Sequence, residues 1–166
     1  MNRRSMFLIA VAVVVLATAA ATALVAAQSD VAAVRRATAA YHRTEAAQAA
    51  GWDLVEGLDH CFDNPGVGAM GYHYINVDLL DAKTDVLQPE ALVYAPGPNG
   101  QRQFAAVEYI VPVDAWAETG NPDLPSAFGR SFHLNEPLGV YVLHLWLFRN
   151  NPSCMWEDWN PNVSCP

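Results

Sequence analysis

The sequence predicts an α+β domain in which one N-terminal helix packs on a curved antiparallel sheet. A single alanine-rich helical segment comes first, and several short runs rich in β-formers follow it. A loop at 95–100, which contains Asn99-Gly100, favours a hairpin between two of these runs. A small β-barrel with one helix is the alternative arrangement.

The N-terminus has the pattern of a signal peptide. Arg3 and Arg4 form a short positive region, and Met6–Ala27 is an apolar run of 22 residues without a charge. Small residues at the end of the run place the predicted cleavage after Ala27, with Ala23 as second choice. The protein is therefore expected to be secreted or periplasmic. The alternative is an uncleaved membrane anchor through residues 6–27, because the run is long enough to span a bilayer.

The remaining chain, residues 28–166, is strongly acidic. Removing 27 of the 166 residues leaves 139, enough for one domain with its own core. This part keeps seven of the nine basic residues and all seventeen acidic ones, so its net charge is −10 with neutral histidines. Such a charge repels phosphate backbones and lipid head groups, which argues against nucleic acid and, after cleavage, against membrane partners. A small molecule or a metal ion is the expected partner, and the oligomeric state stays open.

The helix is predicted to start at Ser29 or Asp30, which can cap it, and to run to about Ala50. Its alanine content favours helix, and Gly51 is a natural residue for the C-terminal end. One stripe of residues at helical spacing is expected to face the sheet: Val34, Tyr41, Gln48 and Trp52.

The second half of the domain is predicted to be mostly strands. Asn64-Pro65-Gly66 marks a turn, 78–89 is a polar connection, and Asp114–Glu118 is a short-helix candidate. The strand candidates, in order, are Gly68–Val77, Ala91–Tyr94, Gln103–Val111, Ser131–Leu134 and Gly139–Phe148. The last of them is apolar on both faces, which is typical of a central strand that is covered on both sides.

Three strands each carry one ionisable residue among apolar ones. Strand alternation places His73, Glu108 and His144 on faces that are otherwise aliphatic or aromatic. If the three point into one concavity, two imidazoles and a carboxylate suit a transition-metal ion such as Zn, Cu, Fe or Mn. The same groups can also bind a small polar ligand or transfer a proton.

Further residues extend this candidate site. His133, in a loop-rich region, is a candidate fourth metal ligand or a residue of the rim. An aromatic wall from Tyr72, Tyr109 and Trp146 would suit a small organic ligand. No catalytic residue is assigned, because the chain has neither a nucleophile elbow nor a glycine-rich phosphate loop.

The alternative to a binding site is a purely structural role for these histidines, in an envelope structural or interaction domain. A histidine on a strand is often only hydrogen-bonded to a neighbour, and a buried Glu108 can be satisfied by one of these same histidines. The spacing is not a metal signature either, since the sequence has no H-x-H and no H-E-x-x-H.

The chain has three cysteines, Cys61, Cys154 and Cys165, and an exported protein meets an oxidising compartment. A Cys61–Cys165 disulfide would close the longer loop and anchor the C-terminal segment Asn150–Pro166, which has little regular pattern. A local Cys154–Cys165 disulfide is the alternative.

Several short motifs occur together along the chain. They are Met70-Gly71-x-His73-Tyr74-x-Asn76, Pro89-Glu90-x-Leu92-x-Tyr94, Ala106-Val107-Glu108-Tyr109, Leu143-His144-x-Trp146 and Asn151-Pro152. As a set, they resemble a family of small exported bacterial proteins to which no activity is assigned, over about Tyr41 to Cys165. The family pattern has a glycine near Cys154. The resemblance therefore implies that Cys154 is the unpaired thiol and that Cys61 pairs with Cys165.

Overall fold

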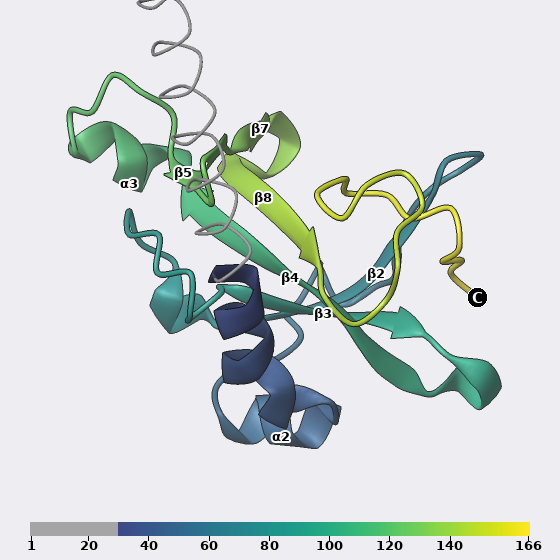
Figure 1. Ribbon diagram of the computed structural model, residues 1–166. Coiled ribbons are helices and arrows are strands. Elements are labelled where there is room, and N and C mark those ends of the chain that lie inside the picture. The colour runs from purple at the N-terminus through teal and green to yellow at the C-terminus, as the bar shows by residue number, and fades with distance from the viewer. Residues whose placement is uncertain (1–29) are drawn as a thin grey trace, which may run out of the picture.

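The computed structural model describes residues 30–166 (Figure 1). The predicted signal peptide, residues 1–27, lies outside the described residues. None of the helices within 30–166 combines the length and the apolar character that a membrane crossing requires.

The predicted N-terminal helix is divided into two. Residues 30–38 are helical, a 3-10 turn η1 (Ala39–Tyr41) follows, and α2 (Thr44–Ala49) starts after a break. The Thr38 hydroxyl donates to the Val34 carbonyl at 2.9 Å, a bond that bends helices, and the Tyr94 hydroxyl donates to the Tyr41 carbonyl at 2.6 Å. The Tyr41 carbonyl is thereby bonded to the sheet, which explains why one continuous helix to about Ala50 was the wrong prediction.

The strands form one six-stranded antiparallel sheet in the order β1-β2-β3-β4-β8-β7. They are β1 (Phe62–Asn64), β2 (Gly68–Ile75), β3 (Ala91–Pro96), β4 (Arg102–Pro112), β7 (His133–Asn135) and β8 (Val140–Trp146). The predicted α+β class is confirmed. The sheet curls into a half-barrel, and it stays open because β1 and β7 remain edges.

Short elements connect these strands. They are η2 (Val77–Leu79), η3 (Pro98–Gly100), α3 (Val113–Glu118), η4 (Glu136–Leu138) and a separate hairpin of β5 (Ser126–Ala127) with β6 (Arg130–Ser131). The predicted strand Ser131–Leu134 is split between β6 and β7 at Phe132, which is buried. The predicted hairpin loop has Asn99 at φ +62°, a left-handed conformation that asparagine tolerates well.

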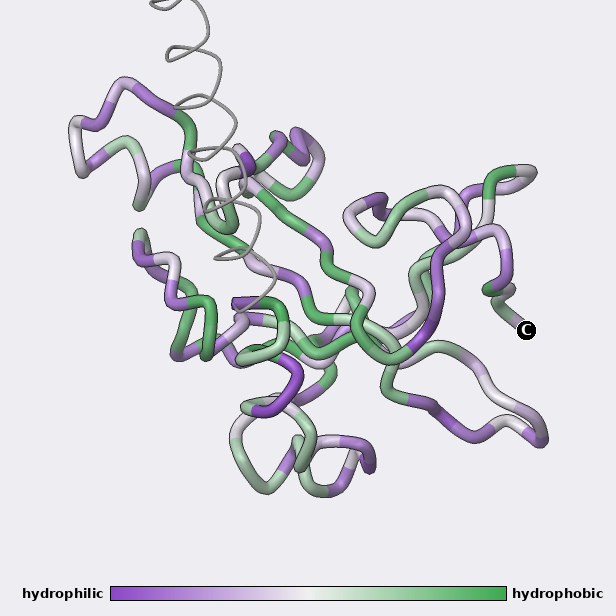
Figure 2. The backbone as a smooth tube through the Cα atoms, viewed as in Figure 1, coloured by the Kyte–Doolittle hydropathy of each residue, from purple (hydrophilic) through white to green (hydrophobic). Residues whose placement is uncertain are grey.

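The sheet has two covered faces, and Figure 2 shows its central strands as largely hydrophobic. The helix-side face packs against the N-terminal helices and includes Tyr74, Leu92, Tyr94, Val107, Tyr109, Leu143 and Leu145. The opposite face, here the tail-side face, includes Ile75, Ala91, Val93, Ala106, Ile110, Val142 and Trp146. Strand alternation places His73, Glu108 and His144 on this tail-side face.

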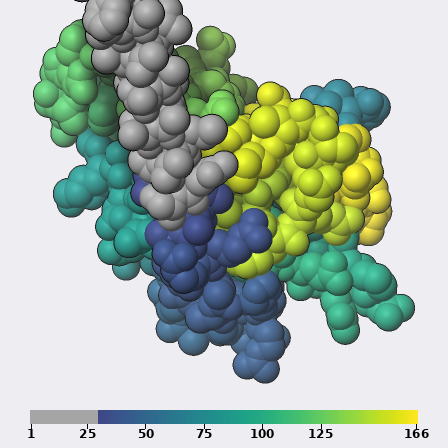
Figure 3. Space-filling model, viewed as in Figure 1, coloured from purple at the N-terminus to yellow at the C-terminus, as the bar shows by residue number. Residues whose placement is uncertain are grey.

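The C-terminal tail, residues 150–166, covers one end of the tail-side face and forms a continuous part of the surface (yellow, Figure 3). Ala69 and Asn160 pair as an isolated β-bridge, and the Trp146 indole donates to the Glu157 carbonyl at 2.7 Å. Gly68 has φ +146°, and a Cβ there would overlap the Asn160 backbone, so this contact requires glycine.

A disulfide joins Cys61 to Cys165 across 104 residues, and Cys154 is a free, exposed thiol. This is the predicted pairing, which closes the longer of the two alternative loops. It ties the end of the tail to the residue that precedes β1.

Candidate functional site

The structure brings His73, Glu108 and His144 together from three strands. Glu108 on β4 lies directly opposite His144 on β8, and His73 reaches across β3 to Glu108. Nε2 of His73 lies 3.4 Å from Oε2 of Glu108, and the rings of the two histidines are 6.2 Å apart. All three side chains are buried, and His144 has no exposed surface.

Burial determines the protonation of the His73–Glu108 pair. Loss of solvation lowers the pKa of His73 to about 3, and the nearby His144 lowers it further. Loss of solvation also raises the pKa of Glu108 to about 8, helped by the charge of Asp158. Although the geometry would allow an ion pair, both shifts favour the uncharged forms. Near neutral pH, these shifts favour a protonated Glu108 carboxylic acid beside a neutral His73 imidazole.

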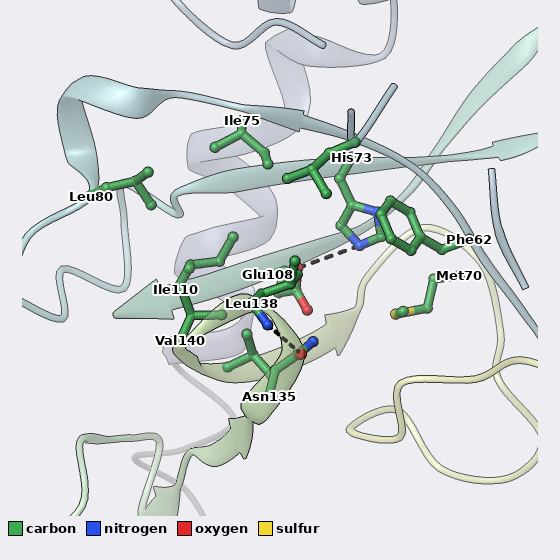
Figure 4. A pocket seen from close by; sticks show the side chains of 12 residues that line it. Phe62, Met70, His73, Ile75, Leu80, Glu108, Ile110, Asn135, Leu138 and Val140 are labelled. Carbon is green, nitrogen blue, oxygen red and sulfur yellow. Dashed lines mark hydrogen bonds and ion pairs between the residues drawn. The ribbon is translucent and has the colours of Figure 1, made fainter. Parts of the chain in front are cut away.

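An apolar cavity of about 170 Å³ opens beside this pair. Its walls come from β1, β2, β4, β7, β8, η4 and two connecting segments: Leu58, Phe62, Met70, Ile75, Leu80, Ile110, Asn135, Leu138, Val140 and Val142. Figure 4 shows His73 and Glu108 facing each other among these side chains. Apart from Asn135, the pair supplies the cavity's polar side chains, so it is the polar part of an otherwise apolar pocket.

A second acid–histidine pair lies next to the first. His133 on β7 contacts Asp158 of the tail, with Nε2 and Oδ2 3.0 Å apart. Burial acts to raise the pKa of Asp158, but the hydrogen bond from His133 and the neighbouring histidines lower it overall. The same hydrogen bond raises the pKa of His133. The His133 side chain is half-exposed and contacts the tail, and it does not line the cavity.

His144 lies between the two pairs. Burial lowers its pKa to about 4, although the charge of Asp158 acts in the opposite direction. Neither ring nitrogen has a hydrogen-bond partner among the described residues, and Oδ1 of Asp158 is likewise buried without one. Its ring packs on Trp146 with a centroid distance of 4.8 Å. Unsatisfied buried polar atoms of this kind are rare in folded proteins and mark a site of interest.

The predicted aromatic wall of Tyr72, Tyr109 and Trp146 does not line the cavity. Tyr72 and Tyr109 alternate with His73 and Glu108 and therefore lie on the helix-side face, where the Tyr109 hydroxyl donates to the Val86 carbonyl at 2.8 Å. Trp146 is on the tail-side face, but it is buried under the tail. The wall is instead aliphatic, with Phe62 as its aromatic ring.

Sequence reasoning missed two carboxylates near the site, the half-buried Asp158 and the buried Glu90. Asp158 sits in the irregular tail, where no periodic pattern marks it. Glu90 precedes β3 and accepts a hydrogen bond from the Ile110 amide at 2.9 Å, while burial raises its pKa to about 7. The β3–β4 register places Glu90 near Glu108, and the packing of the tail on the sheet places Asp158 there; a sequence shows neither.

Within residues 30–166, no group of three or more histidine, cysteine or carboxylate side chains is arranged to hold a metal ion. The predicted metal ligands His73, Glu108, His144 and His133 instead fall into two acid–histidine pairs with His144 between them. Comparison with family models, with curated proteins and with solved structures gave no match. Function therefore has to be inferred from the site itself.

Stability is expected to fall as the pH rises from about 6.5 to 8. Between pH 4.5 and 8 the folded protein holds the Glu108 proton, which the unfolded chain has released, so stability decreases with pH through this range. His73 and His144 have the opposite effect, because their pKa values are lower in the folded protein than in the unfolded chain. Below pH 6.5 the unfolded chain binds protons that these folded histidines do not, so they offset the loss of stability only up to that pH. Glu90 and His133, whose pKa values are raised, add to the decrease above it.

Urea unfolding at pH 6.5, 7.25 and 8 measures this effect. One proton held by the folded state alone changes the free energy of unfolding by about 1.4 kcal/mol per pH unit. Between pH 6.5 and 8, Glu108→Gln should therefore lose about 1–2 kcal/mol less stability than wild type. Asp114→Asn, an exposed carboxylate of α3, is the control and should leave the wild-type slope unchanged. Equal slopes in wild type and Glu108→Gln would show that Glu108 is already ionised at neutral pH.

Proposed function

We propose that this protein is an exported binding protein for a small, largely apolar organic molecule with one hydrogen-bonding oxygen. The observation that carries the proposal is the buried His73–Glu108 pair at an apolar cavity, where burial shifts both pKa values toward the uncharged forms. Ligand sites are typically apolar, with a few polar groups that fix orientation. The signal-peptide pattern and the Cys61–Cys165 disulfide support a place outside the cytoplasm.

The cavity volume limits the size of the ligand. At about 170 Å³ it is smaller than most drug-sized sites, which span about 300–1,000 Å³. A dry protein cavity of about 150 Å³ is known to hold benzene. The ligand class is therefore a single ring or a short aliphatic chain.

The polar pair determines the chemistry of the ligand. The Glu108 carboxylic acid can donate to a carbonyl or hydroxyl oxygen, while the neutral His73 can accept from a hydroxyl group. A charged ligand would lose its solvation in an apolar pocket that holds no fixed opposite charge. A neutral aldehyde, ketone or phenol fits these requirements better than a carboxylate.

Ligand-observed NMR with benzaldehyde, toluene and benzoate at pH 6 tests the proposal. Benzaldehyde should bind about fivefold more tightly than toluene, because one hydrogen bond contributes about 1 kcal/mol. Benzoate should bind more weakly than either. Glu108→Leu should abolish the preference for benzaldehyde while toluene still binds.

A filled cavity provides the matched control. Val140→Phe places a ring in the cavity and should abolish binding of all three probes, whereas Leu134→Phe on the exposed part of β7 should not. Binding that survives Val140→Phe, or wild-type protein that binds none of the probes, would contradict the proposal.

A transition-metal ion is the second candidate ligand. The observation in its favour is His144, whose two nitrogens have no partner, next to the unpaired Oδ1 of Asp158. Zn, Cu, Fe and Mn all accept imidazole and carboxylate ligands, although a third ligand would have to move into place. Metal content of the same preparation, purified without a chelator or an affinity tag of histidines, separates the two. Stoichiometric metal that is lost in His144→Ala would support this candidate.

A further inference from the structure

Four of the seven basic residues in 28–166 gather at one end of the molecule, away from the cavity. Arg43 and Arg102 line an open groove between α2 and the start of β4, and Arg149 lines an adjoining hollow. The two hollows share Gln103, Phe104 and Phe148. Figure 1 places α2 and the β3–β4 hairpin at this same end of the molecule. Because residues 28–166 carry a net charge of −10, such a concentration of arginines is unexpected.

The floor of the groove is aromatic. The rings of Phe104 and Phe148 are 4.7 Å apart, and the His42 ring meets Phe148 edge-on at 4.7 Å. The guanidinium of Arg35 lies 5.8 Å from the Phe148 ring centre. The groove therefore combines an apolar floor with a cationic rim.

Contacts with other side chains hold two of the arginines in place. Arg102 stacks on the Tyr72 ring, with its central carbon 4.0 Å from the ring centre, and donates to the Tyr74 hydroxyl. Nη2 of Arg149 donates a hydrogen bond to the Asn162 carbonyl at 2.7 Å. Both guanidinium groups are thereby oriented before a ligand arrives, and each keeps further donors free. The lining includes one carboxylate, Glu45, against these cations.

We propose that this groove binds a short acidic oligosaccharide. Guanidinium groups pair with carboxylates through two parallel hydrogen bonds, and the C–H face of a sugar ring packs on aromatic side chains. The amides of Gln101 and Gln103 supply the neutral donors and acceptors that hydroxyl groups need. The groove, at about 740 Å³, is within the usual size range of ligand sites.

The acidity of the whole protein favours a short ligand over a nucleic acid or a membrane. At physiological ionic strength the Debye length is about 8 Å, so a small anion in the groove responds mainly to the nearby arginines. A long polyanion or an anionic bilayer would extend beyond the patch and meet the acidic remainder of the surface. This site is independent of the cavity around Glu108.

Calorimetric titration with trigalacturonic acid in about 0.15 M salt tests the proposal. Arg43→Gln/Arg149→Gln should weaken binding at least about tenfold, since hydrogen bonds to charged groups contribute more than neutral ones. The matched control is Lys83→Gln/Arg130→Gln, which removes the same charge from exposed positions outside the groove and should change affinity less than about twofold.

Two further measurements make the test decisive. Maltotriose, an uncharged trisaccharide, should bind much more weakly than trigalacturonic acid, and Glu108→Gln should leave the titration unchanged. The proposal would be overturned by equal losses in the two double variants, by no binding to wild type, or by retention on phosphatidylglycerol vesicles without binding of the sugar.

Discussion

Replacing His73 and Glu108 together with leucine should leave the free energy of unfolding unchanged or raise it, whereas either single replacement should lower it by about 1–3 kcal/mol. The reason is that the two buried side chains are each other's polar partners, with Nε2 and Oε2 3.4 Å apart. Removing one leaves a buried polar group without its partner. Removing both replaces the pair with apolar surface that matches the surrounding Ile75, Ile110 and Val142.

This comparison also separates the two interpretations of the histidines. If the pair is only structural, the stability changes should be the same, but wild type and the double variant should show no difference in their relative affinities for benzaldehyde and toluene. If the pair is present for ligand binding, the double variant should keep or gain stability and lose the preference for benzaldehyde over toluene. In that case the wild type is less stable than the double variant, a cost that is common where function needs buried polar groups.

Urea denaturation of wild type, both single variants and the double variant at pH 6 gives the coupling energy directly. Val93→Leu is a useful control, because it alters packing on the same face without a polar group. If the loss of stability in the double variant equals the sum of the two single losses, the two side chains do not interact, which would contradict a His73–Glu108 pair. The pH of 6 matters, because Glu108 is then protonated and no buried charge is created.

The fold could be predicted from local patterns wherever a segment obeys one period. Alternation and β-formers identified β2, β3, β4 and β8, and Asn99-Gly100 identified the hairpin between β3 and β4. The helix break could not be predicted in this way. It depends on the Tyr94 hydroxyl, which bonds the Tyr41 carbonyl from 53 residues away.

The same distinction applies to the candidate site. Alternation placed each of His73, Glu108 and His144 among apolar residues on one face of its own strand, and the strand order and register bring the three together. Asp158 belongs to a tail without a period, and its position depends on the Ala69–Asn160 bridge. The basic groove was also invisible, because Arg43, Arg102 and Arg149 are far apart in the sequence and no local run of charge marks them.

Removing the disulfide is expected to have the largest effect of any change considered for stability. Cys61→Ser/Cys165→Ser should lower the free energy of unfolding by about 4–5 kcal/mol, because a crosslink across about 100 residues strongly restricts the unfolded chain. Domains of this size are stable by about 5–15 kcal/mol, so the variant should be close to unfolding at physiological temperature. Thermal and urea unfolding under non-reducing conditions measure the loss.

The free cysteine provides the control for this experiment. Cys154 is exposed and unpaired, so Cys154→Ser should change stability by less than about 0.5 kcal/mol. A large loss in Cys154→Ser would instead support the local Cys154–Cys165 pairing. A double variant as stable as wild type would mean that the tail holds its place without the link. Its other contacts, such as the Trp146 indole bond to Glu157, would then be sufficient to keep Asp158 beside His133.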